Sequence, residues 1–557
     1  MRLGVAERAF VLTLLPLCLL LSCRSREPTR AEALSDSDAP RLIILLVIDQ
    51  GSADYLERFR PLLKYGFHRL LEEGVVFTET LHHHSDTKTA PGHASLATGK
   101  HPSHHGVIAN SWFDPASGKT VDAVEDDRFD PEWSPHRLLA STLGDWLKDS
   151  EPRSKVFGAS AKPRAAVLLA GRNADAAYWY DEENGHFVTS DYYQEDEPDW
   201  LTEFHRELFV DRYFGQAWEP LPEVVSVTAN YEIEPVEREP FEHRFPHPLG
   251  RATVAPEEHF YEDLFESSPF VDEYLGVFAK ALIRSEGLGR DAATDFLGLS
   301  FSAADKVGHH WGPNSPELLD VLLRLDRTLG DLLAFVDQEV GREHVVVALT
   351  ADHGVNPLPA YLQRHGVEAR RLGAEDILCF QRLEGELEQR FGEGRWFAAD
   401  LRFDGELAAA RGIALAELEA ETRRLLESCP GVARVWTRSE LESGAAAAEP
   451  LGEFFINSFH VERSPDLMVQ LEKHFLAWTS LATTHGAVYR YDTHVPWLLR
   501  LPSGAGGVVT APVYTVDVAP TLARLAGVTP PSDIDGIDRS DMLSGLAAVA
   551  QRSPTLH

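Results

Sequence analysis

The sequence predicts an α/β fold in three layers, in which helices cover both faces of a mostly parallel central sheet and insertions cap it. A continuous apolar run at 42–48 and two mainly apolar stretches at 296–301 and 344–349 are typical of strands buried on both faces. Stretches with apolar residues at helical spacing separate some of these runs. Strands that alternate with helices indicate this layered architecture.

The first strand has the sequence LIILLVI and ends at Asp49. Helical spacing over about 53–72 predicts that a helix follows it.

The second strand, 296–301, leads to Asp305, and an amphipathic helix of about 317–338 comes next. The third strand, 344–349, ends just before Asp352. Ligands of open α/β sheets bind beyond the carboxyl ends of the strands. We therefore expect three carboxylates to meet at one edge of the sheet: Asp49, Asp305 and Asp352.

The rest of the chain divides into a leader, a tether, insertions and a tail. Two long stretches interrupt the strand and helix pattern and are predicted to be caps. One is acidic, aromatic and proline-rich, and the other contains a helical segment at 405–428 and a Gly/Ala-rich loop at 443–448. The predicted boundaries are a signal peptide at 1–22, a tether at 23–40, one domain at 41–545 with insertions at about 181–270 and 365–470, and a tail at 546–557.

The N-terminus has the pattern of a bacterial lipoprotein signal. Arg2 and Arg8 flank a basic start, and the apolar run 9–21 is too short for a typical membrane span. The run ends in Leu-Leu-Ser-Cys, which resembles the lipobox and predicts lipidation of Cys23. The alternative is an ordinary cleaved signal with an incidental cysteine. We expect a periplasmic or cell-surface protein that contacts the membrane only through Cys23.

Thr89, in the segment TKTAPGH, is the candidate nucleophile. A threonine hydroxyl attacks poorly until a metal or a base removes its proton. Pro91 favours a helix that starts here, and the N–H groups of that helix would face an anion at Thr89. The alternative is a threonine that only caps the helix, and Thr87 and Ser95 are rival hydroxyls.

Histidines accompany the three carboxylates. Asp352 and His353 are adjacent at a strand end, and Asp305 and His309 share one face if their segment is helical. Carboxylate and imidazole groups suit Zn²⁺. Any single pair is more often a capping aspartate or a surface histidine, whereas the whole set at successive strand ends predicts a metal site.

Other histidines and the cysteines are less informative. His82-His83-His84 and His104-His105 have no carboxylate at a suitable position beside them, so we do not expect them to be ligands, and we expect the triple histidine to be a loop feature. Cys379 and Cys429 could pair in an oxidising compartment, but two cysteines 50 residues apart are weak evidence for a disulfide. They do not suggest a metal site.

Charge restricts the partners. The chain has 52 basic and 87 acidic residues, a net charge of −35, which argues against nucleic-acid binding. So acidic a surface also repels phosphate anions. Metals and a few local cations must therefore reverse the field if the substrate is a phosphate ester.

Several motifs together resemble the alkaline phosphatase superfamily, and most closely its PafA-type, single-threonine phosphatases. They occur in order from about residue 42 to 540, and as a set they are highly specific. They are LLVIDQ, TKTAPGHASLATGKHPSHHGVIANSWFD, AKPRAAVLLAGRNADAAYWYD, DKVGHHWG, TADHG, TTHGAVYRYDTHVPWLL and VDVAPTLARLAGV.

The resemblance implies an alkaline-phosphatase-like fold and a site with two Zn²⁺ ions and a phosphothreonine intermediate at Thr89. One zinc would be bound by Asp49, Asp352 and His353, and the other by Asp305, His309 and His485. His494, in YDTHVP, is the alternative to His485. Asn110, Lys162 and Arg164 match the contacts to substrate phosphate, although Lys-Pro-Arg replaces the commoner Lys-Asp-Arg.

The function implied is a lipid-anchored alkaline phosphatase acting on phosphate monoesters of small molecules. A nucleotide pyrophosphatase/phosphodiesterase of the same superfamily is the second hypothesis. A non-catalytic surface lipoprotein that binds phosphate groups is a hypothesis of another class. A sulfatase is excluded by the absence of the Cys-x-Pro-x-Arg or Ser-x-Pro-x-Arg motif.

Overall fold

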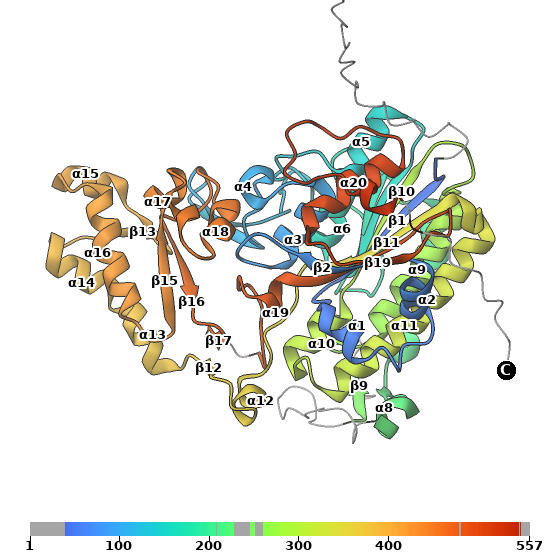
Figure 1. Cartoon of the computed structure of the whole chain (residues 1–557), viewed down its shortest axis with the longest axis horizontal. Coiled ribbons are helices and arrows are strands. Elements are labelled where there is room, and N and C mark those ends of the chain that lie inside the picture. The colour runs from blue at the N-terminus through green and yellow to red at the C-terminus, as the bar shows by residue number, and fades with distance from the viewer. Residues whose placement is uncertain are drawn as a thin grey trace, which may run out of the picture. The chain divides into compact units, whose positions relative to one another are not determined.

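The computed structural model describes residues 39–207, 209–227, 245–250, 260–477, 481–544 and 546. The predicted signal peptide, nearly all of the tether and most of the tail lie outside these residues. The main sheet of the fold has ten strands (Figure 1). In spatial order its strands are β19 (Gly507–Val509), β2 (Val75–Leu81), β18 (His494–Arg500), β11 (Val345–Ala351), β1 (Leu42–Ile48), β10 (Asp295–Phe301), β5 (Val156–Ser160), β6 (Ala176–Tyr180) and β7 (Phe187–Val188), and β20 (Val513–Tyr514) pairs with β2.

The sheet is mostly parallel, as predicted. β1 pairs in parallel with β10 and β11 along its whole length, and β5 continues the parallel set beyond β10. β18 runs antiparallel to β11 and β2, and β7 runs antiparallel to β6. Because β1, β5, β10 and β11 point the same way, the residues that follow them meet at one edge.

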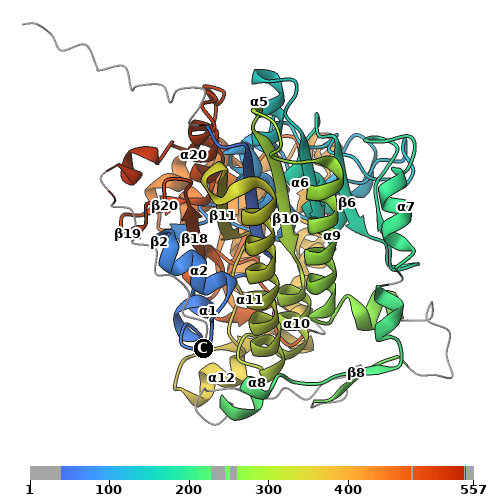
Figure 2. The same ribbon diagram turned by 90° about the vertical axis from the view of Figure 1, so that its right-hand side faces the viewer.

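Side chains of β1 alternate between two apolar cores, one on each face of the sheet, so the three-layer prediction is confirmed. Leu42, Ile44 and Leu46 belong to one core, and Ile43 and Leu45 to the other. Figure 2 shows α9 and α11 running across the first face. The helices of this face are α1 (Ala53–Arg58), α2 (Gly66–Glu73), α9 (Phe270–Glu286), α10 (Ala303–Trp311) and α11 (Pro316–Val336); those of the other face are α3 (Thr89–Thr98), α5 (Leu143–Ser150), α6 (Pro163–Ala170) and α20 (Val518–Leu525).

Two helix predictions need correction. The expected helix at 53–72 is two helices, α1 and α2, because Pro61 lies between them and cannot continue a helix. The expected segment 405–428 is also two helices, separated at Gly412, whose φ of 68° ends the first. The predicted loop at 443–448 contains a short 3₁₀ turn at Ala445–Ala448.

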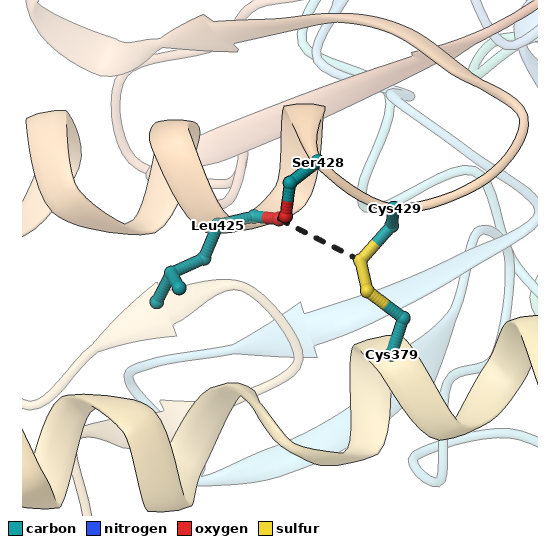
Figure 3. The surroundings of a disulfide bond; sticks show 4 residues. All are labelled: Cys379, Leu425, Ser428 and Cys429. Carbon is teal, nitrogen blue, oxygen red and sulfur yellow. Dashed lines mark hydrogen bonds between the residues drawn. A yellow bond between two sulfur atoms is a disulfide. The ribbon is translucent and has the colours of Figure 1, made fainter.

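The 365–470 insertion has its own apolar cluster, which includes Trp396, Phe403 and Leu418 (orange elements in Figure 1). A disulfide joins Cys379 and Cys429 and ties two helical segments of the insertion together (Figure 3). The elements of this region are β12 (Arg370–Arg371), α13 (Ala374–Gln381), α14 (Leu383–Phe391), β13 (Phe397–Ala399), β14 (Arg402–Phe403), α15 (Gly405–Arg411), α16 (Leu415–Glu427), β15 (Val432–Thr437), α17 (Arg438–Glu442), α18 (Gly452–Ser458), β16 (Leu467–Leu471) and β17 (Phe475–Leu476).

The 181–270 insertion is described in part. Its buried Trp218 donates to Asp320 of α11, which joins the insertion to the helical layer. Its elements are α7 (Asp199–His205), β8 (Gln216–Trp218), α8 (Pro222–Val227) and β9 (His247–Leu249); short elements elsewhere are α4 (Pro102–His105), β3 (Ser111–Asp114), β4 (Lys119–Asp122), α12 (Pro359–Arg364) and α19 (Arg490–Thr493). Across the described ranges, no helix has both the length and the apolar composition needed to span a bilayer.

Candidate active site

The predicted ligands converge at the carboxyl edge of the sheet. Asp49 directly follows β1, and Asp352 and His353 directly follow β11. Asp305 and His309 lie one turn apart on α10, which begins just after β10. His485 comes from the loop before α19. The sequence therefore predicted correctly that these side chains meet, although their roles stay predictions.

Asp305, His309 and His485 form one group, whose ligand atoms lie within 4.8 Å of one another. Asp305 Oδ1 is 3.1 Å from His309 Nε2 and 3.5 Å from His485 Nε2. The spacing of four residues on α10 brings Asp305 and His309 together, as the sequence predicted.

Asp49, Asp352 and His353 form the second group, and all three are fully buried. His353 Nε2 lies 3.4 Å from Asp49 Oδ1 and 3.4 Å from Asp352 Oδ2. These three buried atoms make no hydrogen bond within the part of the chain that the structure describes. Buried polar atoms without partners are costly, so their convergence fits a cation that binds all three. Asp305 also lies within 4.8 Å of Asp49 and His353 and connects the two groups.

The Nδ1 atom of each candidate imidazole ligand forms a hydrogen bond with a backbone carbonyl. His309 contacts the Thr483 carbonyl at 2.9 Å, His485 that of Thr87 at 2.7 Å, and His353 that of Gly354 at 3.0 Å. A carbonyl only accepts, so Nδ1 must donate and Nε2 keeps its lone pair. This arrangement orients an imidazole for metal binding.

The electrostatics of the groups also favour a cation. Burial, together with Asp305 and Asp352, raises the pKa of Asp49. Burial lowers the pKa of His353 to about 3, which keeps its ring neutral. Burial would raise the pKa of Asp305, but His309 and Lys162 outweigh it and hold the pKa low. Three carboxylates at such close range are stabilised by positive charge.

Lys162 supplies part of that charge. It directly precedes α6, and its Nζ donates to Asp49 Oδ2 at 2.6 Å and to Asp305 Oδ2 at 2.5 Å. Burial opposes the charged form, but the two carboxylates outweigh it and raise the pKa of Lys162. The ammonium group therefore lies between the two ligand groups, and the unbonded oxygen of Asp49 is left for a metal.

Thr89 is the first residue of α3 and is nearly buried. Within the described residues its hydroxyl makes no hydrogen bond, whereas the rival hydroxyls are engaged. Thr87 Oγ1 donates to the Ala487 carbonyl at 3.0 Å, and Ser95 Oγ pairs with His105 Nε2 at 3.1 Å. The geometry thus favours Thr89 over Thr87 and Ser95.

Asn110 lies beside this helix start. Its Oδ1 accepts from the Ala90 N–H at 2.8 Å. A backbone N–H only donates, so the Asn110 oxygen faces Ala90 and its amide NH₂ remains available to a phosphate oxygen.

Arg164 lies in the first turn of α6, where Pro163 fits the first helical position. Its Nη2 is 3.1 Å from Asp122 Oδ2 of β4. The carboxylate next to Arg164 therefore comes from a distant hairpin and not from the residue between the two cations.

Besides Asp122, the sequence reasoning missed two residues of this site. Gln50 is buried, its backbone N–H donates to Asp352 Oδ1 at 3.1 Å, and its Nε2 donates to Asp305 Oδ1 at 2.8 Å. It does so with φ 64°, a conformation that favours glycine. The only signal in the sequence was a polar residue directly after Asp49 at the end of a buried strand. His93 is the other: its Nδ1 donates to the Thr89 carbonyl at 2.8 Å and lies 3.2 Å from Asp352 Oδ2.

The remaining histidines lie outside both groups. His82, in the loop after β2, lies 3.0 Å from the Ala351 carbonyl. His104, in α4, pairs with Asp535 at 2.8 Å. His494 Nε2 donates to the Thr78 carbonyl at 2.8 Å, so His485 and not His494 is near Asp305.

Three comparisons identify the family. The sequence pattern of the type I phosphodiesterase / nucleotide pyrophosphatase family matches residues 43–494. Alkaline phosphatase PhoV of Synechococcus elongatus is 31% identical over 530 residues, which cover 90% of this chain and 93% of that protein. Alkaline phosphatase PafA of Elizabethkingia meningoseptica is 31% identical over 519 residues, 89% of this chain and 93% of its own.

A crystal structure of wild-type alkaline phosphatase PafA superposes with a TM-score of 0.82 at 29% identity and covers 90% of this chain and 99% of that one. Sequence and fold therefore agree over nearly the whole length of both proteins. The residues present, the carboxylate and imidazole groups of Asp49, Asp305, His309, His353 and His485 with Asp352 beside them, fit the metal centre that such relatives imply. The chain belongs to the type I phosphodiesterase / nucleotide pyrophosphatase family, as a hydrolase of the alkaline phosphatase type.

Proposed function

We propose that this protein is a secreted, lipid-anchored alkaline phosphatase that hydrolyses phosphate monoesters through a phosphothreonine intermediate at a site with two zinc ions. The observation that carries the proposal is the pair of Asp/His groups joined by Asp305, to which His93 links Thr89 at the start of α3 through its contacts with the Thr89 carbonyl and Asp352. Asp49, Asp352 and His353 would hold one zinc, and Asp305, His309 and His485 the other.

When bound, two zinc ions supply Lewis-acid chemistry, because they favour the threonine alkoxide and stabilise negative charge on the leaving oxygen. Thr89 Oγ forms a bond to phosphorus as the bond to the ester oxygen breaks, and the alcohol leaves. Water then hydrolyses the phosphothreonine to inorganic phosphate and regenerates Thr89. The Asn110 amide, Lys162 and Arg164 would bind the non-bridging oxygens, where charge must be stabilised.

Charge matching supports a dianionic substrate. Two zinc ions, Lys162 and Arg164 exceed the three ligand carboxylates and the alkoxide by about two positive charges. Asp122, which pairs with Arg164, lowers that excess by about one. The site is still positive within an acidic protein, so it attracts the anion that the surface repels.

A phosphodiesterase is the second candidate, and the family match at 43–494 favours it. A diester carries one negative charge fewer and a second organic group. It therefore gains less from Lys162 and Arg164 than a monoester does.

A substrate panel tests the proposal. The zinc-loaded protein is expected to hydrolyse p-nitrophenyl phosphate at least about 100-fold faster than bis(p-nitrophenyl) phosphate or p-nitrophenyl sulfate. Removal of the metal with a chelator should abolish this activity, and added Zn²⁺ should restore it. Faster hydrolysis of the diester would assign the protein to the phosphodiesterases, and activity that survives chelation would exclude the metal mechanism.

Secretion and lipidation rest on the N-terminal sequence, whose residues lie outside the described ones. The disulfide between Cys379 and Cys429 supports an oxidising compartment. We expect the full chain, expressed in bacteria, to enter the detergent phase of Triton X-114, and the Cys23→Ser variant to stay in the aqueous phase. Equal partitioning of the two proteins would contradict lipidation at Cys23.

Gln50→Gly is expected to change metal affinity and stability in opposite directions. The variant loses the amide that orients Asp305, so zinc affinity should fall about 10- to 100-fold. It also relieves the left-handed conformation at φ 64°, which costs about 1 kcal/mol for a residue with a side chain. The metal-free variant should therefore unfold at the same temperature as the wild type or higher. Zinc competition with a chromophoric chelator, together with calorimetry, measures both effects, and an unchanged zinc affinity would refute the orienting role.

A further inference from the structure

A cavity of about 420 Å³ lies beside the candidate active site, between the sheet domain and the 365–470 insertion. Its volume is within the range of small-molecule sites, roughly 300–1,000 Å³. The sheet domain contributes residues of β3 and of the loop 484–489, and the insertion contributes residues 399–402 and 455–471. Asp49, Asp352 and His353, the group whose zinc is expected from the family resemblance to bind Thr89 as well, do not line it.

The cavity reaches one edge of the candidate active site. His485 lines it, and so does Lys88, which directly precedes the nucleophile. In an in-line displacement the leaving oxygen departs on the side opposite the attacking oxygen. If Thr89 shares the zinc of Asp49, Asp352 and His353, the leaving oxygen faces the group that contains His485. The cavity is therefore on the side where the alcohol part of the ester must lie.

The walls of the cavity are mainly apolar and aromatic. They include Trp112, Phe455, Met468, Phe475 and Tyr489. Arg463 of the insertion lies over the ring of Trp112, with its guanidinium carbon 5.3 Å from the ring centroid. Flat apolar walls of this kind bind ring systems by burial and stacking.

The lysine and arginine side chains of the wall are already engaged. Lys88 Nζ pairs with Asp86 at 2.8 Å, Arg463 Nη1 donates to the Arg137 carbonyl at 2.7 Å, and Arg402 Nη2 donates to the Arg463 carbonyl at 3.0 Å. A second phosphoryl group placed here would have to compete for these cations. The wall thus favours an uncharged organic group over an anionic one.

We propose that this cavity binds the alcohol part of the substrate, and that the preferred substrates are phosphate monoesters of flat, aromatic or apolar alcohols. This inference rests on the proposed function, because it assigns the leaving-group side from the role of Thr89. It also gives the 365–470 insertion a role. The insertion contributes one wall of the cavity and the Arg463 side chain over Trp112, so it determines which esters are accepted.

Two variants and a matched control test the proposal on the zinc-loaded full chain. Ala477→Trp fills the cavity from an exposed position of its wall, and Met468→Ala removes apolar wall from a half-buried one. Met542→Ala is the control, since Met542 is also half-buried but packs against the core on the α20 side of the sheet. The substrates are phenyl phosphate and 2-naphthyl phosphate, whose leaving alcohols have similar acidity.

The wild type and Met542→Ala are expected to prefer the naphthyl ester about tenfold in kcat/KM, as an apolar pocket does for added apolar surface. Ala477→Trp should abolish this preference, and Met468→Ala should reduce it to about threefold. Activity on the phenyl ester, whose single ring covers less of the cavity wall, should fall less than activity on the naphthyl ester in both variants. No preference in the wild type, or the same preference in Ala477→Trp, would overturn the proposal.

Binding of phosphonates, which are not hydrolysed, separates the cavity from the catalytic function. We expect naphthylmethylphosphonate to bind the wild type about tenfold more tightly than methylphosphonate, and Ala477→Trp to bind both equally. If no ester is hydrolysed but the phosphonate difference is found, the proposed function fails and the cavity stands as a binding site. If esters are hydrolysed but the phosphonates bind alike, the cavity assignment fails and the phosphatase stands.

Discussion

Replacement of Thr89 by alanine is expected to lower kcat/KM for p-nitrophenyl phosphate at least about 1,000-fold, or about 4 kcal/mol of transition-state stabilisation. Of the two side-chain hydroxyls in the segment TKTAPGH, only that of Thr89 lies at the helix start and has no hydrogen bond among the described residues. Without it no phosphothreonine can form, and water must attack without the positioning that a side chain provides.

Controls separate the nucleophile from its surroundings. Thr89→Ser keeps an oxygen at the same position and should retain most of the activity. Thr87→Ala should have a small effect, since its hydroxyl donates to the Ala487 carbonyl. Zinc content must equal that of the wild type in each variant. Unchanged turnover in Thr89→Ala would mean that the activity has another nucleophile, and a fully inactive wild type that still binds zinc would favour a non-catalytic binding protein.

The double variant Lys162→Ala with Arg164→Ala is expected to lose about 1,000-fold in kcat/KM on a monoester and less than about tenfold on a diester. Each cation contributes a charge-assisted hydrogen bond to a non-bridging oxygen, worth roughly 2 kcal/mol. A diester has fewer charged oxygens and loses less. The ratio of the two effects therefore reports the charge of the substrate for which the site is built.

This experiment requires zinc-loaded protein, because in the structure Lys162 also separates Asp49 from Asp305. Removal of its charge from a metal-free site would leave the carboxylates to repel one another and would confuse binding with stability. The single variant Asp122→Asn is a useful companion, since it frees Arg164 without removing it. Equal losses on p-nitrophenyl phosphate and on its bis ester would contradict the monoesterase assignment.

Much of the fold could be predicted from the sequence, because buried parallel strands have an unmistakable composition. The run LIILLVI is β1 with the expected bounds, and the strands before Asp305 and Asp352 are also where they were expected. The errors were in helices. Apolar spacing suggested one helix at 53–72, while Pro61 allows only two short ones. Periodicity reports which face is buried and says little about where a helix is interrupted.

The site was predicted in part. The spacing of Asp305 and His309 indicated a common helix face, and His485 was preferred over His494, which contacts the Thr78 carbonyl instead. Gln50 was missed although it follows Asp49 directly, since its role depends on a left-handed backbone that no pattern in one sequence reveals. Asp122 was missed because its contact with Arg164 spans 42 residues.

Apart from Lys162 and Arg164, which only the family resemblance singled out, the sequence by itself determined the residue types and their order: strand runs that end in carboxylates, and a threonine before a helix start. These follow from local composition and spacing, which do not depend on the rest of the chain. Only the tertiary structure decided which atoms face one another. Asp49 Oδ1, Asp352 Oδ2 and His353 Nε2 are buried without a hydrogen bond among the described residues, Gln50 bridges Asp305 and Asp352, and a distant insertion walls the cavity. Each of these features requires segments hundreds of residues apart to pack together.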